Sequence, residues 1–187
     1  MTMININRKI TDPFNRYKMQ KLVVQVIYTS NCFKTILVNI SGVAKDLHRS
    51  PLHLTKYFAL ELSTSMRFDE KSNLYTLNGD YHQNKLQDIL DNFIHQFVLC
   101  RYCENPETDL NRDEKNSDKI HQRCYACGNT SAIKTNCHKF VKFILKNWSQ
   151  ENNNPYELET TNIFEKEVRI YLLEIYIYQV LLEYFIK

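Results

Sequence analysis

Four of the six cysteines form two pairs of the pattern C-x2-C, Cys100 with Cys103 and Cys124 with Cys127. The two-residue spacing lets both thiolates of a pair reach one ion. Four thiolates arranged in a tetrahedron satisfy Zn²⁺ and leave no coordination position open. We therefore predict that these cysteines bind one structural zinc ion, which replaces the hydrophobic core that so short a segment cannot build.

The remaining cysteines and the nearby histidines fit other roles better. Cys137, His138 and His121 are interpreted as packing or solvent-facing residues rather than ligands, and Cys32, in a predicted hairpin turn, as a plain thiol. The chain begins without the apolar core of a signal peptide. The cysteines are therefore interpreted as metal ligands and free thiols rather than disulfides.

The sequence offers no constellation for catalysis by this chain alone. No Cys-His or Ser-His-Asp arrangement stands out, and the acids Asp69, Glu70, Glu107 and Asp109 fall in predicted turns, where solvated surface is the simpler interpretation. Glycine is scarce, with 3 in the chain, and neither G-x-x-x-x-G-K-[ST] nor G-x-G-x-x-G occurs. An enzyme acting alone, or one that binds a nucleotide itself, is therefore disfavoured.

The N-terminal third of the chain is rich in basic residues with aromatic neighbours. The formal net charge is +3, which permits an RNA-rich environment without requiring one. The basic residues are Arg8, Lys9, Arg16, Lys18, Lys21, Lys34, Lys45, Arg49 and Lys56. Such side chains suit phosphate backbones and exposed bases, but an ordinary solvated surface has the same composition.

Periodicity predicts the elements that position these residues. Residues 1–20 have no clear period and are predicted to form an extended, flexible arm. After the arm we predict a hairpin, two short helices, a second hairpin and an amphipathic helix. In order, they occupy 22–28 with 33–40, 43–47, 50–62, 66–68 with 74–77, and 86–97.

The predicted fold class is α+β, with a small α/β N-terminal subdomain followed by a four-cysteine zinc ribbon and a C-terminal helix. The predicted bounds are 21–98 for the α/β subdomain, 99–146 for the ribbon, 147–162 for a polar linker and 163–187 for the helix. That helix is apolar on most sides, so we expect it to pack on the ribbon, self-associate or bind an unknown partner. No apolar run of about 18 residues predicts a membrane span, and we expect a cytoplasmic protein.

Several motifs resemble the eukaryotic translation initiation factor 5 family, over about residues 4 to 147. They include DPFNRYKM at 12–19, NKLQD at 84–88, FVLC at 97–100, CENPETDL at 103–110 and FILKN at 143–147. The resemblance implies an α/β subdomain followed by a zinc ribbon. It also implies a role in start-codon selection on the small ribosomal subunit, where the family promotes GTP hydrolysis by initiation factor 2 bound to initiator tRNA.

The resemblance also assigns roles to particular residues. Arg16 matches the family's arginine finger, a planar cation that acts in trans on charge developing at the γ-phosphoryl oxygens. The chain would then be a GTPase-activating protein rather than an enzyme itself. Lys34 and Lys56 match family lysines implicated in this role and in contacts near the codon–anticodon. Lys18 and Asn31 are further predicted contacts to tRNA, ribosome or GTPase.

The sequence departs from the family pattern at two places. The first hairpin loop, at 28–32, lacks the usual glycines, which leaves its fit against tRNA open. The family normally has an acidic linker and a C-terminal helical-repeat domain, and the segment 163–187 is too short to be that domain. We therefore expect weaker or differently organised recruitment of initiation factor 2.

Three alternatives stay open at this point. The β subunit of initiation factor 2 shares the fold and the ribbon, and LHRSPLHL at 47–54 resembles it, although its lysine blocks are missing here. A ribosome-binding adaptor or competitor without activating function is the second alternative. A zinc-ribbon factor in transcription is the third, and the motif around Arg16 argues against it.

Overall fold

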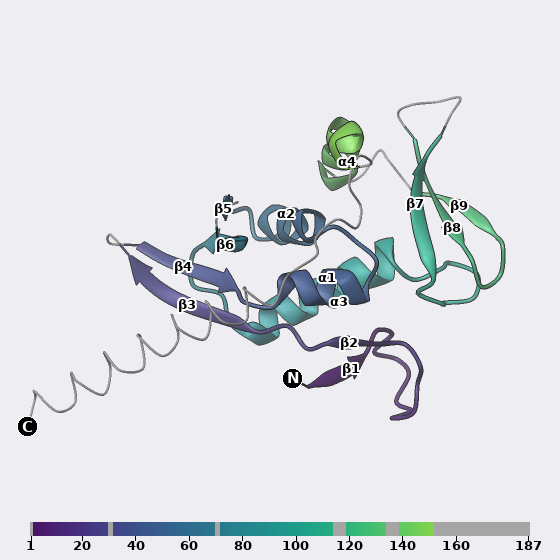
Figure 1. The fold of residues 1–187 in the computed structure, drawn as a ribbon, viewed down its shortest axis with the longest axis horizontal. Helices are drawn as coiled ribbons and strands as arrows, with labels where there is room; N and C mark the ends of the chain where they lie inside the picture. The colour runs from purple at the N-terminus through teal and green to yellow at the C-terminus, as the bar shows by residue number, and fades with distance from the viewer. Residues whose placement is uncertain (1, 30–31, 70–71, 114–118, 134–138, 152–187) are drawn as a thin grey trace, which may run out of the picture. The chain divides into compact units, whose positions relative to one another are not determined.

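The computed structural model describes residues 2–29, 32–69, 72–113, 119–133 and 139–151 (Figure 1). The chain divides into two compact units, Met1–Ser149 and Gln150–Lys187. All described elements lie in the first unit, apart from the end of the last helix. The predicted C-terminal helix at 163–187 lies outside the described residues, as does Asn31.

Four helices and three antiparallel sheets make up the described part of the chain, which confirms the predicted α+β class. In chain order the elements are β1 (Met3–Asn5), β2 (Lys18–Gln20), β3 (Val24–Thr29), β4 (Cys32–Leu37), α1 (Ile40–Asp46), α2 (Pro51–Glu61), β5 (Met66–Asp69), β6 (Leu74–Asn78), α3 (Gln83–Phe97), β7 (Thr108–Arg112), β8 (Ile120–Cys124), β9 (Thr130–Ala132) and α4 (Lys139–Glu151). None of the described helices is long and apolar enough to cross a bilayer.

The central sheet has the strand order β3-β4-β6-β5, so both predicted hairpins are confirmed and join through β4 and β6. Alternate residues of β4 and β6 are buried, as expected for a sheet with one covered face. The buried set is Thr35, Leu37, Tyr75 and Leu77.

The predicted helices are also present. Pro51 is the first residue of α2, where its missing N–H leaves no intrahelical bond unmade, and Ser50 precedes it with extended backbone. The apolar stripe of α3 is buried, namely Leu86, Leu90, Phe93, Ile94 and Phe97. A helix with one apolar stripe folds by burying that stripe, and α3 does so.

The core includes one helix that we did not predict, α4. The ring of Phe140 lies 5.0 Å from that of Phe97, 5.4 Å from Tyr57 and 5.7 Å from Phe93, measured between centroids. Phe140, Val141 and Ile144 are fully buried. Thus α4 begins inside the segment predicted as ribbon and continues into the predicted linker, because its apolar stripe packs on the α/β subdomain. The domain boundaries as such stay predictions.

The N-terminal arm contains two short strands that we did not predict. β1 pairs with β2 in the register Met3↔Gln20 and Asn5↔Lys18. The backbone N–H of Gln20 donates to Asp46 Oδ2 at 2.8 Å, which ties β2 to α1. Strands this short leave no periodic signal in the sequence. The predicted mobility of the arm stays a prediction.

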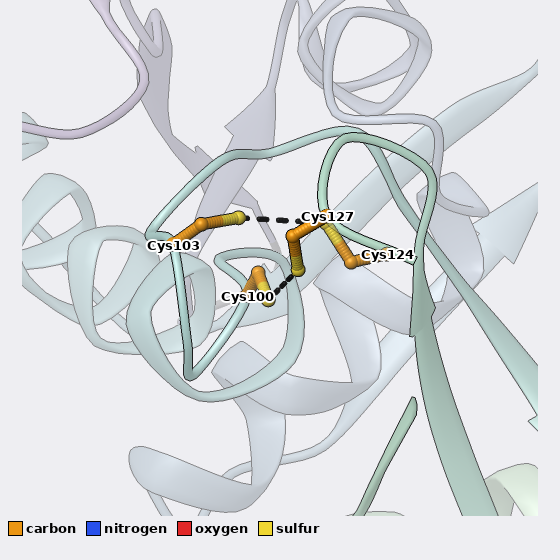
Figure 2. Close-up of side chains that lie close together, drawn as sticks. All are labelled: Cys100, Cys103, Cys124 and Cys127. Atoms are coloured by element: carbon orange, nitrogen blue, oxygen red, sulfur yellow. Dashed lines mark hydrogen bonds between the residues drawn. The ribbon is translucent and has the colours of Figure 1, made fainter. Parts of the chain in front are cut away.

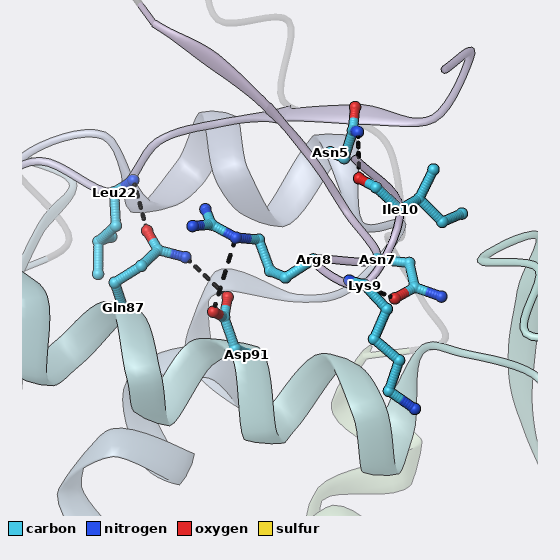
Figure 3. A network of polar contacts seen from close by, with 8 residues as sticks. All are labelled: Asn5, Asn7, Arg8, Lys9, Ile10, Leu22, Gln87 and Asp91. Carbon is cyan, nitrogen blue, oxygen red and sulfur yellow. Dashed lines mark hydrogen bonds and ion pairs between the residues drawn. The ribbon is translucent and has the colours of Figure 1, made fainter. Parts of the chain in front are cut away.

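Polar contacts also attach the arm to α3 (Figure 3). Arg8 Nε lies 4.0 Å from Asp91 Oδ2, and Gln87 Nε2 donates to Asp91 Oδ1 at 3.0 Å. Gln87 Oε1 accepts the backbone N–H of Leu22 at 3.3 Å. The pKa of Asp91 is raised overall, because burial outweighs the lowering effects of its hydrogen bond from Gln87 and of the charge of Arg8.

Strands β7, β8 and β9 form the third sheet. We call this sheet the ribbon, together with Cys100, Cys103, Cys124 and Cys127. Arg49 joins the α/β subdomain to this ribbon. Its Nη2 donates to the carbonyl of Phe97 at 2.8 Å and its Nη1 to the carbonyl of Thr108 at 2.6 Å. We grouped Arg49 with the basic residues of a possible nucleic-acid surface, but here it satisfies carbonyls at a helix end and a strand start.

Candidate functional site

The four cysteines of the two C-x2-C pairs lie together (Figure 2). Their sulfur atoms are all within 4.8 Å of one another. Cys100 Sγ lies 3.7 Å from Cys127 Sγ, and Cys103 Sγ lies 3.6 Å from Cys124 Sγ. A tetrahedron with metal–sulfur bonds of about 2.3 Å has edges of about 3.8 Å, so the cluster fits one tetrahedral metal ion.

The cysteines lie in two turns with the same backbone hydrogen bonds, which we call the first knuckle (residues 100–107) and the second knuckle (124–129). In the first, the N–H of Cys100 donates to Asn105 O, and the N–H of Glu104 donates to Cys100 O. In the second, the N–H of Cys124 donates to Asn129 O, and the N–H of Gly128 donates to Cys124 O. The two knuckles thus present their thiols in equivalent ways to one point.

The knuckles also supply hydrogen bonds to the sulfur atoms. Hydrogen bonds lower the pKa of Cys127 from 9.0 to about 6, chiefly the one from the backbone N–H of Asn129 and then those from the other three thiols. The backbone N–H of Tyr102 donates to Cys100 Sγ at 3.4 Å. Burial raises the pKa of the Cys124 thiol. Because thiolates are the ligands, a bound cation would favour deprotonation of all four cysteines.

The first knuckle makes side-chain contacts with the N-terminal arm. Tyr17 Oη donates to Glu107 Oε1 at 2.9 Å, and Asn105 Nδ2 donates to Tyr17 Oη at 3.1 Å. Asn7 Nδ2 donates to Glu104 Oε2 at 3.2 Å. We interpreted Glu107 as solvated turn surface, and we predicted no contact between Tyr17 and the first knuckle.

Arg16 is next to the anchored Tyr17, but its own side chain is 82% exposed. Its Nη2 lies 3.6 Å from Glu107 Oε1, and its Cζ lies 5.4 Å from the ring centroid of Tyr17. The residue predicted as an arginine finger is therefore on the surface, beside the four-cysteine ribbon. Its predicted role is not tested by this arrangement.

The lysines predicted to contact tRNA, ribosome or GTPase lie on three different elements. Lys34, on β4, lines an open hollow of the central sheet together with Arg67 of β5. Lys56, on α2, covers the ring of Phe143, with 5.3 Å between its Nζ and the ring centroid. Lys18 Nζ donates to the carbonyl of Pro13 at 2.6 Å. Their roles stay predictions.

Fold and site together define a class of protein: a small α+β domain joined to a ribbon with a cluster of four cysteines, with an N-terminal arm on the first knuckle. Comparison with known families gives this class a name. The family described as the domain found in initiation factors 2B and 5 matches residues 7–130, and the chain belongs to it.

Known relatives agree with this assignment. The chain is 48% identical over 144 residues to eukaryotic translation initiation factor 5 of Mus musculus, which covers 77% of this chain and 33% of the relative. The factor of the same name from Saccharomyces cerevisiae is 39% identical over 144 residues, covering 77% of this chain and 35% of the relative. The chain thus spans about a third of the length of these curated relatives. The family predicted from the sequence is confirmed.

Proposed function

We propose that this chain promotes GTP hydrolysis by initiation factor 2 during start-codon selection. It would act in trans as a GTPase-activating protein, in the cytoplasm and on the small ribosomal subunit. Its partner would be initiation factor 2 carrying GTP and initiator tRNA. Family membership and the relatives named translation initiation factor 5 support this proposal.

The observation that carries the proposal is the environment of Arg16. Its guanidinium is 82% exposed, and its ion pair with Glu107 is long, at 3.6 Å, and open to water. Exposed pairs of this kind contribute about 0–1 kcal/mol, so phosphate oxygens of a partner can replace Glu107 at little cost. A planar guanidinium then stabilises charge on the transferred phosphoryl group.

We further propose that the metal of the cysteine cluster is a structural Zn²⁺ held by Cys100, Cys103, Cys124 and Cys127. Sulfur–sulfur distances of 3.6 and 3.7 Å and an all-thiol donor set support this choice. Bound zinc would fix the two knuckles relative to each other and leave no position for a substrate. The proposed activity would then depend on residues that do not bind the metal, such as Arg16.

The surface that meets RNA is proposed to include the hollow of the central sheet. Lys34 and Arg67 both line this hollow, together with the polar residues Thr76 and Asn78 and one carboxylate, Asp80. Two cations with hydrogen-bonding neighbours suit a phosphate backbone. Lys18, Lys56 and Asn31 stay as further proposed contacts to tRNA, ribosome or GTPase.

Single-turnover GTP hydrolysis in reconstituted initiation complexes tests the main proposal. We expect the parent chain to accelerate release of inorganic phosphate from initiation factor 2. Arginine fingers are worth roughly 10³–10⁵ in rate, so Arg16→Ala should lose at least about a hundredfold of this acceleration. Arg123→Ala is the matched control, because Arg123 is an exposed arginine of β8, outside the arm and outside both knuckles.

The same assay separates the alternatives. If Arg16→Ala hydrolyses as fast as the parent chain, the arginine-finger role is wrong. If the parent binds the ribosomal complex and leaves the hydrolysis rate unchanged, a binding role as adaptor or competitor replaces the activating one.

A further inference from the structure

We propose that the first knuckle is a docking site for the N-terminal arm and that Tyr17 is a positioning residue, which fixes the main chain next to Arg16. The role given to Arg16 rests on the proposed GTPase-activating function. The docking itself does not, because it is an interaction within this chain.

Tyr17 is held through both its side chain and its main chain. Its hydroxyl donates to Glu107 Oε1 at 2.9 Å and accepts from Asn105 Nδ2 at 3.1 Å. Its N–H donates to Asn15 Oδ1 at 2.8 Å, and its carbonyl accepts the N–H of Ile6 at 3.1 Å. A hydrogen bond to a carboxylate is among the stronger ones. These contacts fix the arm at the residue after Arg16.

A second attachment lies at the other end of the loop between β1 and β2. Asn7 is buried, at 6% exposure, and its Nδ2 donates to Glu104 Oε2 at 3.2 Å. Lys9 Nζ lies 3.7 Å from Glu104 Oε1. The acceptors at both attachments, Glu104 and Glu107, belong to the first knuckle. The loop is therefore closed onto the ribbon at its two ends.

The loop between the two attachments is braced by its own hydrogen bonds. Asn5 Nδ2 donates to the carbonyl of Ile10 at 2.7 Å (Figure 3) and to that of Asp12 at 2.9 Å. The N–H of Phe14 donates to Asp12 Oδ1 at 2.8 Å. The tip itself faces solvent, since Phe14 is 91% exposed. A loop braced in this way, with an exposed tip, suits insertion into a partner.

Arg16 and Tyr17 are thus held very differently although they are neighbours. Tyr17 makes two side-chain hydrogen bonds to the first knuckle, whereas Arg16 makes one exposed, solvent-screened ion pair with Glu107. This combination fixes the backbone and leaves the guanidinium available. A cation presented from an ordered segment loses less conformational freedom on binding than one from a disordered arm.

Amide hydrogen exchange on the full, zinc-loaded chain tests the docking. Tyr17→Phe keeps the ring and removes the hydroxyl. We expect the amides of the arm, including those of Ile6 and Ile10, to exchange roughly tenfold faster, equivalent to about 1.4 kcal/mol. Tyr125→Phe is the matched control, because the Tyr125 hydroxyl donates to Asp109 Oδ2 within the ribbon.

Both variants should keep the parent's zinc content and the slow exchange of α3. Faster exchange confined to the arm of Tyr17→Phe supports docking at the first knuckle. Arm exchange equal to that of the parent chain overturns it. Hydrogen exchange is measured without any GTPase, so its outcome does not depend on whether the chain activates one.

Single-turnover hydrolysis then tests the positioning role. We expect Tyr17→Phe to lower the maximal rate at saturating protein roughly tenfold, with an unchanged half-saturating concentration, and Tyr125→Phe to match the parent. A loosened arm with a parental maximal rate overturns the positioning role and leaves docking intact. No effect of Arg16→Ala in the same assay overturns the proposed function alone.

Discussion

Glu104 and Gly128 occupy the same position in the two knuckles, directly after the second cysteine of each, and both have positive φ, 55° and 74°. Their N–H groups make equivalent bonds, to Cys100 O and Cys124 O. A left-handed backbone favours glycine, and the second knuckle has one. The first knuckle instead has a glutamate, whose carboxylate accepts a hydrogen bond from Asn7 of the arm. The backbone strain at Glu104 thus accompanies an attachment for the arm.

Gly128→Ala should destabilise the zinc-loaded chain by about 1–2 kcal/mol, the cost of a left-handed backbone for a residue with a Cβ. A Cβ at Gly128 would have no atom within 4 Å, so the cost is conformational rather than steric. Urea denaturation gives the free energy of unfolding, with Ala126→Ser in the same knuckle as control. A Gly128→Ala chain as stable as the parent would contradict the strain argument.

Cys124→Ser should abolish stoichiometric zinc binding and destabilise the ribbon. Cys124 is 1% exposed and its sulfur belongs to the cluster, so a hydroxyl there removes one of four thiolate ligands. Cys32→Ser, at an exposed cysteine outside the cluster, should keep one zinc per chain. Elemental analysis after gel filtration measures the metal, and full zinc retention by Cys124→Ser would refute the assigned ligand set.

The sequence predicted the features that depend on local spacing. Two C-x2-C pairs predicted the cysteine cluster, because each pair needs only its own turn to bring its thiols together. The stripe from Leu86 to Phe97 predicted α3 for the same reason, since helical periodicity is contained within one segment.

Contacts between distant segments could not be predicted in this way. Tyr17 and Glu107 are 90 positions apart, and no periodic pattern connects two polar side chains. Arg49 lies in a turn between helices, and nothing in the sequence distinguishes it from a surface arginine. In the structure it donates to the carbonyls of Phe97 and Thr108. The stripe of α4 was present in the sequence, but we attributed its segment partly to the ribbon and partly to the linker that follows it.

Arg49→Met should cost about 2–4 kcal/mol of unfolding free energy. The change removes a guanidinium that donates to the carbonyls of His48, Phe97 and Thr108 and to Thr108 Oγ1, so these half-buried acceptors lose hydrogen bonds. Arg49→Lys should recover only part of the loss, because one ammonium cannot reproduce the planar set of donors. Denaturation of Arg123→Met, at an exposed site on β8, is the control. Equal stability of the Arg49→Met and Arg123→Met chains would show that the hydrogen bonds of Arg49 do not stabilise the fold.

Phe140→Ala should destabilise the chain by about 3–5 kcal/mol, as expected for a large side chain removed from a packed core. Phe140 is fully buried against Tyr57, Phe93 and Phe97. Phe14→Ala makes the same chemical change at a side chain that is 91% exposed, and it should cost less than about 0.5 kcal/mol. If the two variants unfold at the same urea concentration, α4 is not part of the core.

Alkaline pH should destabilise the chain through two core tyrosines. Burial, and then the charge of Glu61, raises the pKa of Tyr57 to about 12 from 10.0, and burial raises the pKa of Tyr75 to about 12. Between about pH 10 and about pH 12 the unfolded chain loses phenolic protons that the folded chain keeps. The free energy of unfolding therefore falls as the pH rises through this range. At about pH 11 each tyrosine should contribute a loss of at most about 1.4 kcal/mol.

Tyr57→Phe should therefore reduce the loss of unfolding free energy between about pH 9 and about pH 11 by about 1 kcal/mol, because a phenylalanine has no proton to lose. Tyr102→Phe, at a side chain that is 65% exposed, should leave the loss unchanged. Urea denaturation of each variant at both pH values gives the difference, in which contributions from lysines and thiols cancel. A parental pH dependence in Tyr57→Phe would mean that the Tyr57 phenol ionises equally easily in the folded and unfolded chains, contrary to its burial beside Phe93 and Phe140.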